Sequence, residues 1–186
     1  MTKKVKASVM DAAKIKRVVS RMATEILERN RDLKNLVIAG IPTRGIVIAK
    51  RIAKVIKDLE KTEIPVGVID IARFRDDGAA SPAEPAAGKS KIRLAVDKKD
   101  VILVDDVLFT GRTIRAAMEA LFDLGRPKSI QLLVLIDRGH RELPIKADYI
   151  GKNVPTSKTE VVNVKLFDID KVNIVTLSDL EIGMKH

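Results

Sequence analysis

The segment VILVDDVLFTGRTIRAAMEALF, residues 101–122, limits the fold of this chain more than any other stretch. It predicts a buried strand over 101–104, an acidic pair (Asp105 and Asp106) at the carboxyl end of that strand, a turn rich in threonine and glycine, and then an amphipathic helix. In an open α/β sheet, ligands bind just beyond the carboxyl ends of the strands. We therefore expect an α/β fold with a ligand site at the acidic pair.

The turn after this strand has the chemistry of a site for a phosphorylated sugar. The first N–H groups of a helix have no intrahelical partner and lie at the positive end of the helix dipole, so they can bind a phosphate. Gly111 lets the backbone approach a ligand closely, and Thr110 and Thr113 add hydroxyl donors. The two carboxylates can accept hydrogen bonds from vicinal hydroxyls and stabilise positive charge that develops at the sugar C1. The segment thus predicts a ribose 5-phosphate site.

Two further loops follow predicted strands and should lie on the same side of the sheet. The loop GIPTRG at 40–45 contains Arg44, which either holds a diphosphate through its planar fork or is a surface arginine of a tight turn. The loop DRGHR at 137–141 contains His140. We interpret His140 as a polar loop residue or phosphate contact in preference to a general base.

The rest of the chain alternates between apolar runs and helical spacing, as expected for a mostly parallel sheet flanked by helices. We expect helices over 11–30 and 46–59, and strands over 36–39, 66–71 and 130–136. Residues 148–178 carry short apolar runs between polar turns, which is typical of a small β-rich cap. Residues 73–91 lack apolar periodicity and are rich in Ala, Pro, Gly and Ser, so we interpret them as a lid or a surface excursion.

Length and composition narrow the class of protein. The 186 residues suit one domain, and the absence of cysteine excludes a disulfide framework and a thiolate zinc site. No apolar run approaches the length of a membrane span, so we expect a cytoplasmic protein without membrane contact. The net charge is +10, and residues 1–34 hold ten Lys/Arg against four Asp/Glu. This bias suits a polyanion such as RNA, or else a lysine-rich solubilising surface.

The segment VILVDDVLFTGRT resembles the phosphoribosyl-pyrophosphate (PRPP) motif of the type I phosphoribosyltransferases. The resemblance extends over nearly the whole chain, because GIPTRG, VGVIDI followed by FRDD, LGRPKSIQLLVLIDRGHRELPIKADYIGKNVPTSKTE and VVNVKL are similar to the bifunctional pyrimidine operon attenuation regulators and uracil phosphoribosyltransferases. It implies a type I phosphoribosyltransferase fold, a mostly parallel central sheet flanked by helices, with a flexible lid loop. We expect one domain over 1–186, with the lid at 73–91 and a small β-rich hood formed mainly by 144–180 together with the N-terminal segment.

The resemblance also implies a reaction and a regulatory role. The reaction is uracil + PRPP to UMP + diphosphate, with Mg²⁺ carried by PRPP and no metal held directly by the protein. The regulatory role is transcription attenuation, in which bound UMP promotes binding to the leader of pyrimidine-operon mRNA. The alternative is a uracil phosphoribosyltransferase or nucleotide-binding protein that has lost RNA regulation. The family suggests a homodimer or a homotetramer.

The same resemblance assigns roles to particular residues. It places catalysis on Asp105, Asp106 and Arg44. It implies substrate binding by Thr43, Arg44, Asp105, Asp106, Val107, Leu108, Phe109, Thr110, Gly111, Arg112, Thr113, Arg138 and Val162, with Thr43 and Arg44 at the pyrophosphate and Arg138 and Val162 at the base. It implies RNA binding by Ser20, Thr24, Arg141 and Lys146. Phe109 replaces the tyrosine expected in the motif, and Ser20 and Thr24 stand where RNA-binding members have threonine and histidine.

Overall fold

The structure, a computed structural model, describes residues 5–76 and 94–180. In these ranges the strands are arranged in a five-stranded sheet with the order β3-β2-β4-β5-β6 and a three-stranded sheet with the order β1-β8-β7. The strands are β1 (Val5–Met10), β2 (Leu36–Gly40), β3 (Val66–Val68), β4 (Asp100–Leu108), β5 (Ser129–Asp137), β6 (Tyr149–Asn153), β7 (Glu160–Lys165) and β8 (Ile174–Asp179). The helices are α1 (Ala12–Arg29), α2 (Arg44–Glu60), α3 (Arg112–Leu124) and α4 (Phe167–Asp170), and short 3-10 turns span Leu33–Asn35 and Ala72–Phe74.

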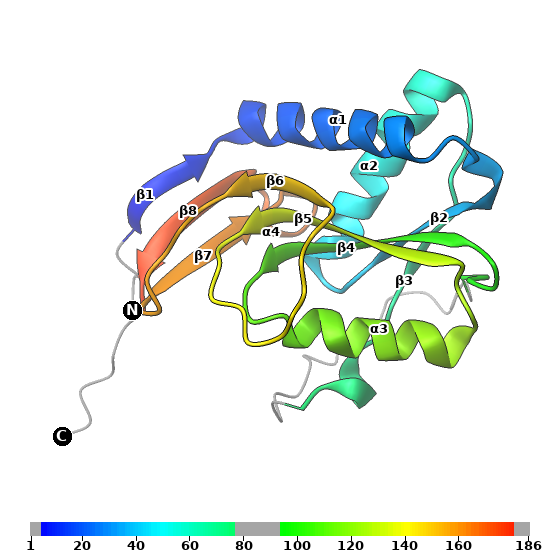
Figure 1. The fold of residues 1–186 in the computed structure, drawn as a ribbon. Coiled ribbons are helices and arrows are strands. Elements are labelled where there is room, and N and C mark those ends of the chain that lie inside the picture. Colours follow the sequence, from blue (N-terminus) through cyan, green and yellow to red (C-terminus); the bar gives the residue numbers. More distant parts are fainter. Residues whose placement is uncertain (1–4, 77–93, 181–186) are drawn as a thin grey trace.

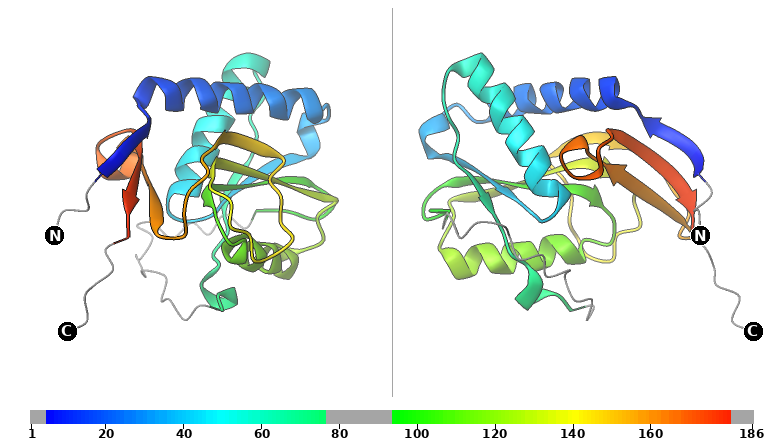
Figure 2. Two further views of the ribbon diagram at one scale, coloured as in Figure 1. Left: turned by 60° about the vertical axis from the view of Figure 1, so that its left-hand side comes forward. Right: turned by 180° about the vertical axis from the view of Figure 1, so that it is seen from behind.

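All pairs in the larger sheet are parallel, and helices cover both of its faces. Figure 1 shows α1 and α2 on one side of this sheet and α3 on the other, and the rear view in Figure 2 shows α2 crossing the sheet. The alternation of side chains along β4 explains the arrangement, since Ile102 and Val104 pack in the cluster with α1 and α2, while Val101 and Leu103 pack in the cluster with α3. A continuous apolar run therefore marks a strand that is buried on both faces.

The smaller sheet is antiparallel and includes the N-terminal segment. Strand β1 pairs with β8, and β8 pairs with β7, so this sheet, here called the hood, brings together an N-terminal strand and two C-terminal strands. One element of the predicted cap is elsewhere: β6 pairs in parallel with β5 and extends the main sheet. Packing explains this correction, because Tyr149 of β6 is buried in the core cluster beneath α1 and donates a hydrogen bond to Gln131 of β5.

Several element boundaries differ from those that the apolar runs predict. Strand β4 continues to Leu108, four residues beyond the expected end, because β5 pairs with it as far as Asp137. Helix α2 begins two residues early, at Arg44, and β3 ends at Val68. Of the predicted lid, residues 77–91 lie outside the described residues.

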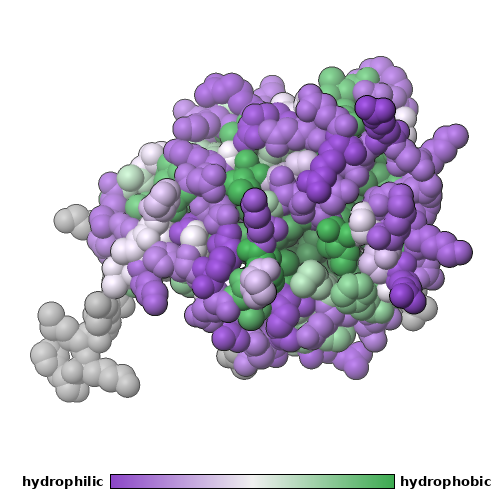
Figure 3. All heavy atoms as spheres, viewed as in Figure 1, coloured by the Kyte–Doolittle hydropathy of each residue, from purple (hydrophilic) through white to green (hydrophobic). Residues whose placement is uncertain are grey.

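The surface agrees with the high content of charged residues. Hydrophilic side chains cover most of the face shown in Figure 3, and polar residues interrupt the apolar ones that show there. None of the helices in the described ranges is long and apolar enough to cross a membrane.

Candidate active site

The acidic pair lies where β4 runs past the end of a neighbouring strand. Pairing between β2 and β4 stops at Gly40 and Val104, whereas pairing with β5 continues. Asp105 is only 6% exposed, and its carboxylate accepts a hydrogen bond of 2.9 Å from the N–H of Asp106. The Asp106 carboxylate in turn accepts one of 3.0 Å from the N–H of Val107. Each carboxylate is therefore held by the backbone at the carboxyl edge of the sheet.

The environment of this pair favours the protonated form. Burial, together with the neighbouring Asp106 carboxylate, raises the pKa of Asp105 well above its usual value. Burial also raises the pKa of Asp106, although a hydrogen bond with Asp105 and the positive charge of Arg44 oppose the rise. A buried carboxyl group, Asp105, thus lies beside a half-buried one, Asp106, and such perturbed neighbouring carboxyl groups are typical of functional sites.

The loop after β2 packs directly against the end of β4. The N–H of Ile41 donates to the carbonyl oxygen of Val104 at 2.9 Å. A Cβ on Gly45 would lie 2.4 Å from that same oxygen and 3.2 Å from Cα of Asp105, so glycine is required for this approach. Thr43 precedes α2, and its exposed side chain makes no capping hydrogen bond. The structure therefore brings Thr43 and Arg44 to the acidic pair, as the order of the loops predicts.

The turn between β4 and α3 forms a cavity of about 200 Å³. Gly111 has a positive φ of 96°, which glycine adopts without strain, and α3 begins at the next residue. The first N–H groups of α3 are thus placed at this turn. The residues that line the cavity are Val107, Leu108, Phe109, Thr110, Gly111, Arg112, Thr113 and Ile114. The seven consecutive residues 107–113, which the resemblance assigns to substrate binding, are therefore brought together around one cavity.

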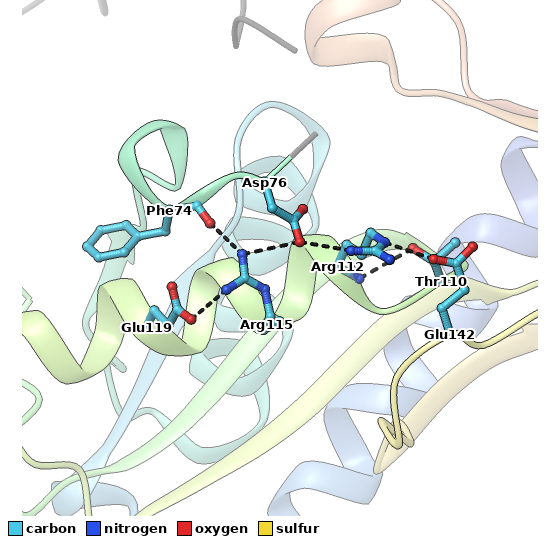
Figure 4. A network of polar contacts seen from close by, with 7 residues as sticks. All are labelled: Phe74, Asp76, Thr110, Arg112, Arg115, Glu119 and Glu142. Atoms are coloured by element: carbon cyan, nitrogen blue, oxygen red, sulfur yellow. Dashed lines mark hydrogen bonds and ion pairs between the residues drawn. The ribbon is translucent and has the colours of Figure 1, made fainter. Parts of the chain in front are cut away.

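The side chain of Arg112 is engaged with carboxylates, as Figure 4 shows. It donates to Glu142 at 2.8 Å and to Asp76 at 2.9 Å. Arg115, one turn further along α3, donates to the carbonyl oxygen of Phe74 at 2.7 Å. These contacts fix the start of α3 from two sides, so the contribution of Arg112 to a phosphate site is expected from its backbone N–H.

Arg138 organises the end of the site beyond β5. It is 6% exposed and donates to the carbonyl oxygens of Ser157 and Glu160 at 3.1 and 2.7 Å, so it holds the segment that leads into β7. Its guanidinium carbon lies 4.0 Å from the ring centroid of Phe109. This stacking links the loop after β5 to the turn at 107–113, and it requires a ring at 109 but no hydroxyl.

A second cavity, of about 350 Å³, lies beside Arg138. Its lining includes residues 137–140 together with Asn153, Pro155 and Thr156. The imidazole of His140 stands edge-on to the Phe109 ring, and its Nε2 contacts the carbonyl oxygen of Thr156. Both contacts hold the imidazole against neighbouring residues. The Val162 side chain is 8% exposed within the core, which leaves main-chain groups of β7 for contact with a base.

The residues expected to bind RNA lie in different surroundings. Thr24 is exposed on α1, Ser20 is partly buried one turn before it, and Lys146 is exposed. The guanidinium of Arg141, by contrast, donates to the carbonyl oxygens of Phe109 at 2.9 Å and Ile145 at 3.0 Å and pairs with a carboxylate. The guanidinium of Arg141 thus supports the turn at 107–113 through Phe109. The sequence did not predict this contact.

The contact between Asp170 and Arg44 could not be predicted from the sequence either. The carboxylate of Asp170 accepts two hydrogen bonds from Arg44, although 126 residues separate the two in the chain. Nothing in the local sequence LFDIDKV distinguishes Asp170 from the exposed Asp168 two positions earlier.

Comparison with known proteins agrees with this geometry. The family sequence model named phosphoribosyl transferase domain matches residues 7–169 of this chain. The "Bifunctional protein PyrR" of Acetivibrio thermocellus is 54% identical over 181 residues, covering 97% of this chain and 98% of that protein. The protein of the same name from Clostridioides difficile is 52% identical over 174 residues, covering 94% and 98%.

Solved structures with low sequence identity share the fold. A hypoxanthine phosphoribosyltransferase from Staphylococcus aureus matches with a TM-score of 0.70 at 19% identity, covering 96% of this chain and 94% of that one. The Trypanosoma cruzi enzyme matches with a TM-score of 0.70 at 16% identity, covering 95% and 98%. With the acidic pair, the turn at 107–113 and the loop at 40–45 at one edge of the sheet, the chain belongs to the phosphoribosyl transferase domain family and, within it, to the bifunctional PyrR proteins.

Proposed function

We propose that the protein transfers a ribose 5-phosphate group from PRPP to uracil, forming UMP and diphosphate. The observation that carries this proposal is the contact between the loop after β2 and the end of β4, which places Thr43 and Arg44 beside Asp105 and Asp106. In this proposal the cavity at 107–114 receives the 5-phosphate next to the pair, and main-chain groups near Val162 receive the uracil. The carboxyl edge of the larger sheet and the hood strand β7 together therefore have a place for each part of the substrate pair.

In the proposed reaction the N1 atom of uracil forms a bond to C1 of the ribose while the bond from C1 to the diphosphate oxygen breaks. The diphosphate leaves with the bonding electron pair, and the N1 proton is released. The carboxylates of Asp105 and Asp106 accept hydrogen bonds from the ribose hydroxyls and stabilise positive charge at C1. Arg44 stabilises negative charge on the leaving diphosphate. Catalysis in this scheme comes from placement and electrostatics, without a protein nucleophile.

We propose that magnesium enters the site with PRPP. Among residues 5–76 and 94–180, no three His, Cys, Asp or Glu side chains are grouped so that they could hold a metal ion. Mg²⁺ usually keeps several waters and binds through substrate phosphates, so the diphosphate of PRPP can carry the ion without a direct protein ligand, while Asp105 and Asp106 remain available to the ribose hydroxyls. When bound, the ion would neutralise part of the diphosphate charge.

The activity is tested by measuring UMP formation from uracil and PRPP with Mg²⁺, with hypoxanthine as the competing base. We expect kcat/KM for uracil to exceed that for hypoxanthine by at least about a hundredfold, because a site shaped for a pyrimidine excludes the larger purine ring. The comparison matters because the structural neighbours are hypoxanthine enzymes. A preference for hypoxanthine would contradict the assignment of the base.

We propose a second function, UMP-dependent binding to the leader of pyrimidine-operon mRNA. The relatives are named as bifunctional proteins, and α1 carries Lys14, Lys16, Arg17 and Arg21, most of them on its exposed side. Such a face suits the phosphates of RNA. The proposal places the protein in the cytoplasm as a homodimer or homotetramer, with Ser20, Thr24, Arg141 and Lys146 at the RNA. The alternative is an enzyme that has lost RNA regulation.

Replacement of Lys146 by alanine is expected to weaken leader-RNA binding several-fold and to leave UMP synthesis unchanged. A lysine that contacts a phosphate releases about one counterion, so the slope of log affinity against log salt concentration should fall by about one. Filter binding with UMP at several salt concentrations measures this effect. Lys57→Ala is the matched control, since Lys57 is an exposed lysine of α2 paired with Glu63. Equal losses in both variants would contradict a specific role for Lys146.

A further inference from the structure

The hood is joined to α2 by two ion pairs. Arg44 and Arg51 lie seven residues apart, on the same side of α2. Arg44 pairs with Asp170 at 2.8 Å, and Arg51 pairs with Asp168 and also donates to Asn173 at 2.9 Å. Both aspartates belong to α4, the short helix between β7 and β8. The proposed diphosphate loop, residues 40–45, and the helix α2 that follows it are therefore joined to the hood through these arginines.

The pair between Arg44 and Asp170 joins both carboxylate oxygens of the aspartate to the arginine. Arg44 donates through Nε at 3.2 Å and through Nη2 at 2.8 Å, one bond to each carboxylate oxygen of Asp170. Asp170 is itself fixed, because the same Oδ2 accepts a bond of 2.9 Å from the N–H of Leu166. The side chain of Asp170 is 17% exposed, whereas that of Asp168 is 53% exposed. A carboxylate held in one orientation thus holds the planar fork of Arg44.

This arrangement leaves Arg44 able to bind a ligand. A guanidinium has five N–H donors, and Asp170 takes two of them, so three remain. Arg44 is also near the acidic pair, because the next residue, Gly45, packs against Cα of Asp105, and the positive charge of Arg44 opposes the rise in the pKa of Asp106. A free arginine side chain must lose rotamer freedom when it binds a phosphate, and an arginine already held does not.

We propose that Asp170 is a positioning residue, which holds the Arg44 guanidinium in the orientation that receives the diphosphate of PRPP. This inference rests on the proposed role of Arg44 at the diphosphate. Asp170 touches no reacting atom and acts through Arg44. Through Asp170 the hood would contribute to PRPP binding, in addition to the proposed contact between its strand β7 and the base.

The test compares Asp170→Asn with Asp168→Asn by steady-state kinetics of UMP synthesis. An asparagine at 170 keeps an oxygen for the N–H of Leu166 but loses the charge and one bond to Arg44, so the hood turn is preserved. We expect the KM for PRPP to rise on the order of tenfold in Asp170→Asn, with the KM for uracil and the thermal unfolding temperature unchanged. We expect kcat to fall less than the KM rises. Asp168→Asn loses a hood contact of the same type without touching Arg44, and it should change the KM for PRPP by less than about twofold.

A double-mutant cycle with Arg44→Ala separates this inference from the proposed function. If Asp170 acts through Arg44, Asp170→Asn should have no further effect on the KM for PRPP in the Arg44→Ala background. An Arg44→Ala variant with normal kinetics would refute the role of Arg44 at the diphosphate. A normal KM in Asp170→Asn beside an impaired Arg44→Ala would overturn the inference alone. So would a lowered KM, because Asp170 would then compete with the diphosphate for Arg44.

Discussion

Replacement of both Asp105 and Asp106 by asparagine is expected to lower UMP synthesis by about a hundred- to ten-thousand-fold. Hydrogen bonds to a charged acceptor contribute roughly 1.5–3 kcal/mol each, so two of them account for about 3–6 kcal/mol of transition-state stabilisation. An amide oxygen can still accept from the N–H of the following residue, which preserves the local backbone bonds. Steady-state kinetics with uracil and PRPP measure the loss, and undiminished turnover would refute the assignment of the site.

The same variant should be more stable than the wild type at neutral pH. The folded-state pKa of each carboxyl is raised, so the folded protein binds more protons than the unfolded chain between the unfolded and folded pKa values. The stability gained from that protonation is complete below the unfolded pKa and is lost as pH rises through the folded pKa. Neutral amides avoid this loss, and we expect the free energy of unfolding to rise by about 0.5–2 kcal/mol at pH 7.5. Thermal melts at decreasing pH should show the advantage shrink.

Asp100→Asn is the matched control for this experiment. Asp100 lies at the opposite end of β4 and accepts hydrogen bonds from Ser129 at 2.6 Å and Lys128 at 3.2 Å. It shares the strand with the acidic pair but is remote from the carboxyl edge of the sheet. Its replacement should leave kcat/KM within about twofold of the wild type. A loss comparable to that of the double variant would mean that any charge change on β4 impairs the enzyme.

The local features of the site could be predicted from the sequence because they depend on neighbouring residues. An apolar strand, an acidic pair and a glycine turn before a helix determine their own geometry, and the structure places residues 107–113 around one cavity. Asp11 likewise caps α1, accepting a hydrogen bond of 2.7 Å from the N–H of Lys14. The continuous burial of β4 from Val101 to Asp105 follows from a strand covered by helices on both faces.

Features that depend on distant partners could not be predicted in this way. The short sequence of β6, YIGKN, is compatible with either sheet, and its pairing with β5 depends on the fit of Tyr149 beneath α1. Arg141 resembles a free basic residue until the fold brings the carbonyl oxygen of Phe109 to its guanidinium. The pairing of Arg44 with Asp170 is of the same kind. Such contacts arise from tertiary packing, which residue spacing along the chain does not encode.

Replacement of Gly45 by alanine is expected to move the loop that carries Thr43 and Arg44 away from the acidic pair. The Cβ of Gly45→Ala would lie 2.4 Å from the carbonyl oxygen of Val104, which belongs to the backbone and cannot rotate away. The start of α2 must therefore move, and it carries Thr43 and Arg44 away from Asp105. A displacement of about 1 Å costs on the order of a hundredfold in rate, and overpacking lowers the free energy of unfolding by about 1–3 kcal/mol.

Gly151→Ala separates the effect on the site from the effect on stability. A Cβ at Gly151 would lie 2.3 Å from the carbonyl oxygen of Leu135, a steric conflict of the same kind between β6 and β5. The methyl group there would face Val18 of α1, away from the diphosphate loop. Both variants should lower the thermal unfolding temperature, but only Gly45→Ala should raise the KM for PRPP and lower kcat. Equal kinetic losses at equal stability would mean that general loosening of the sheet, and not the position of Arg44, limits the reaction.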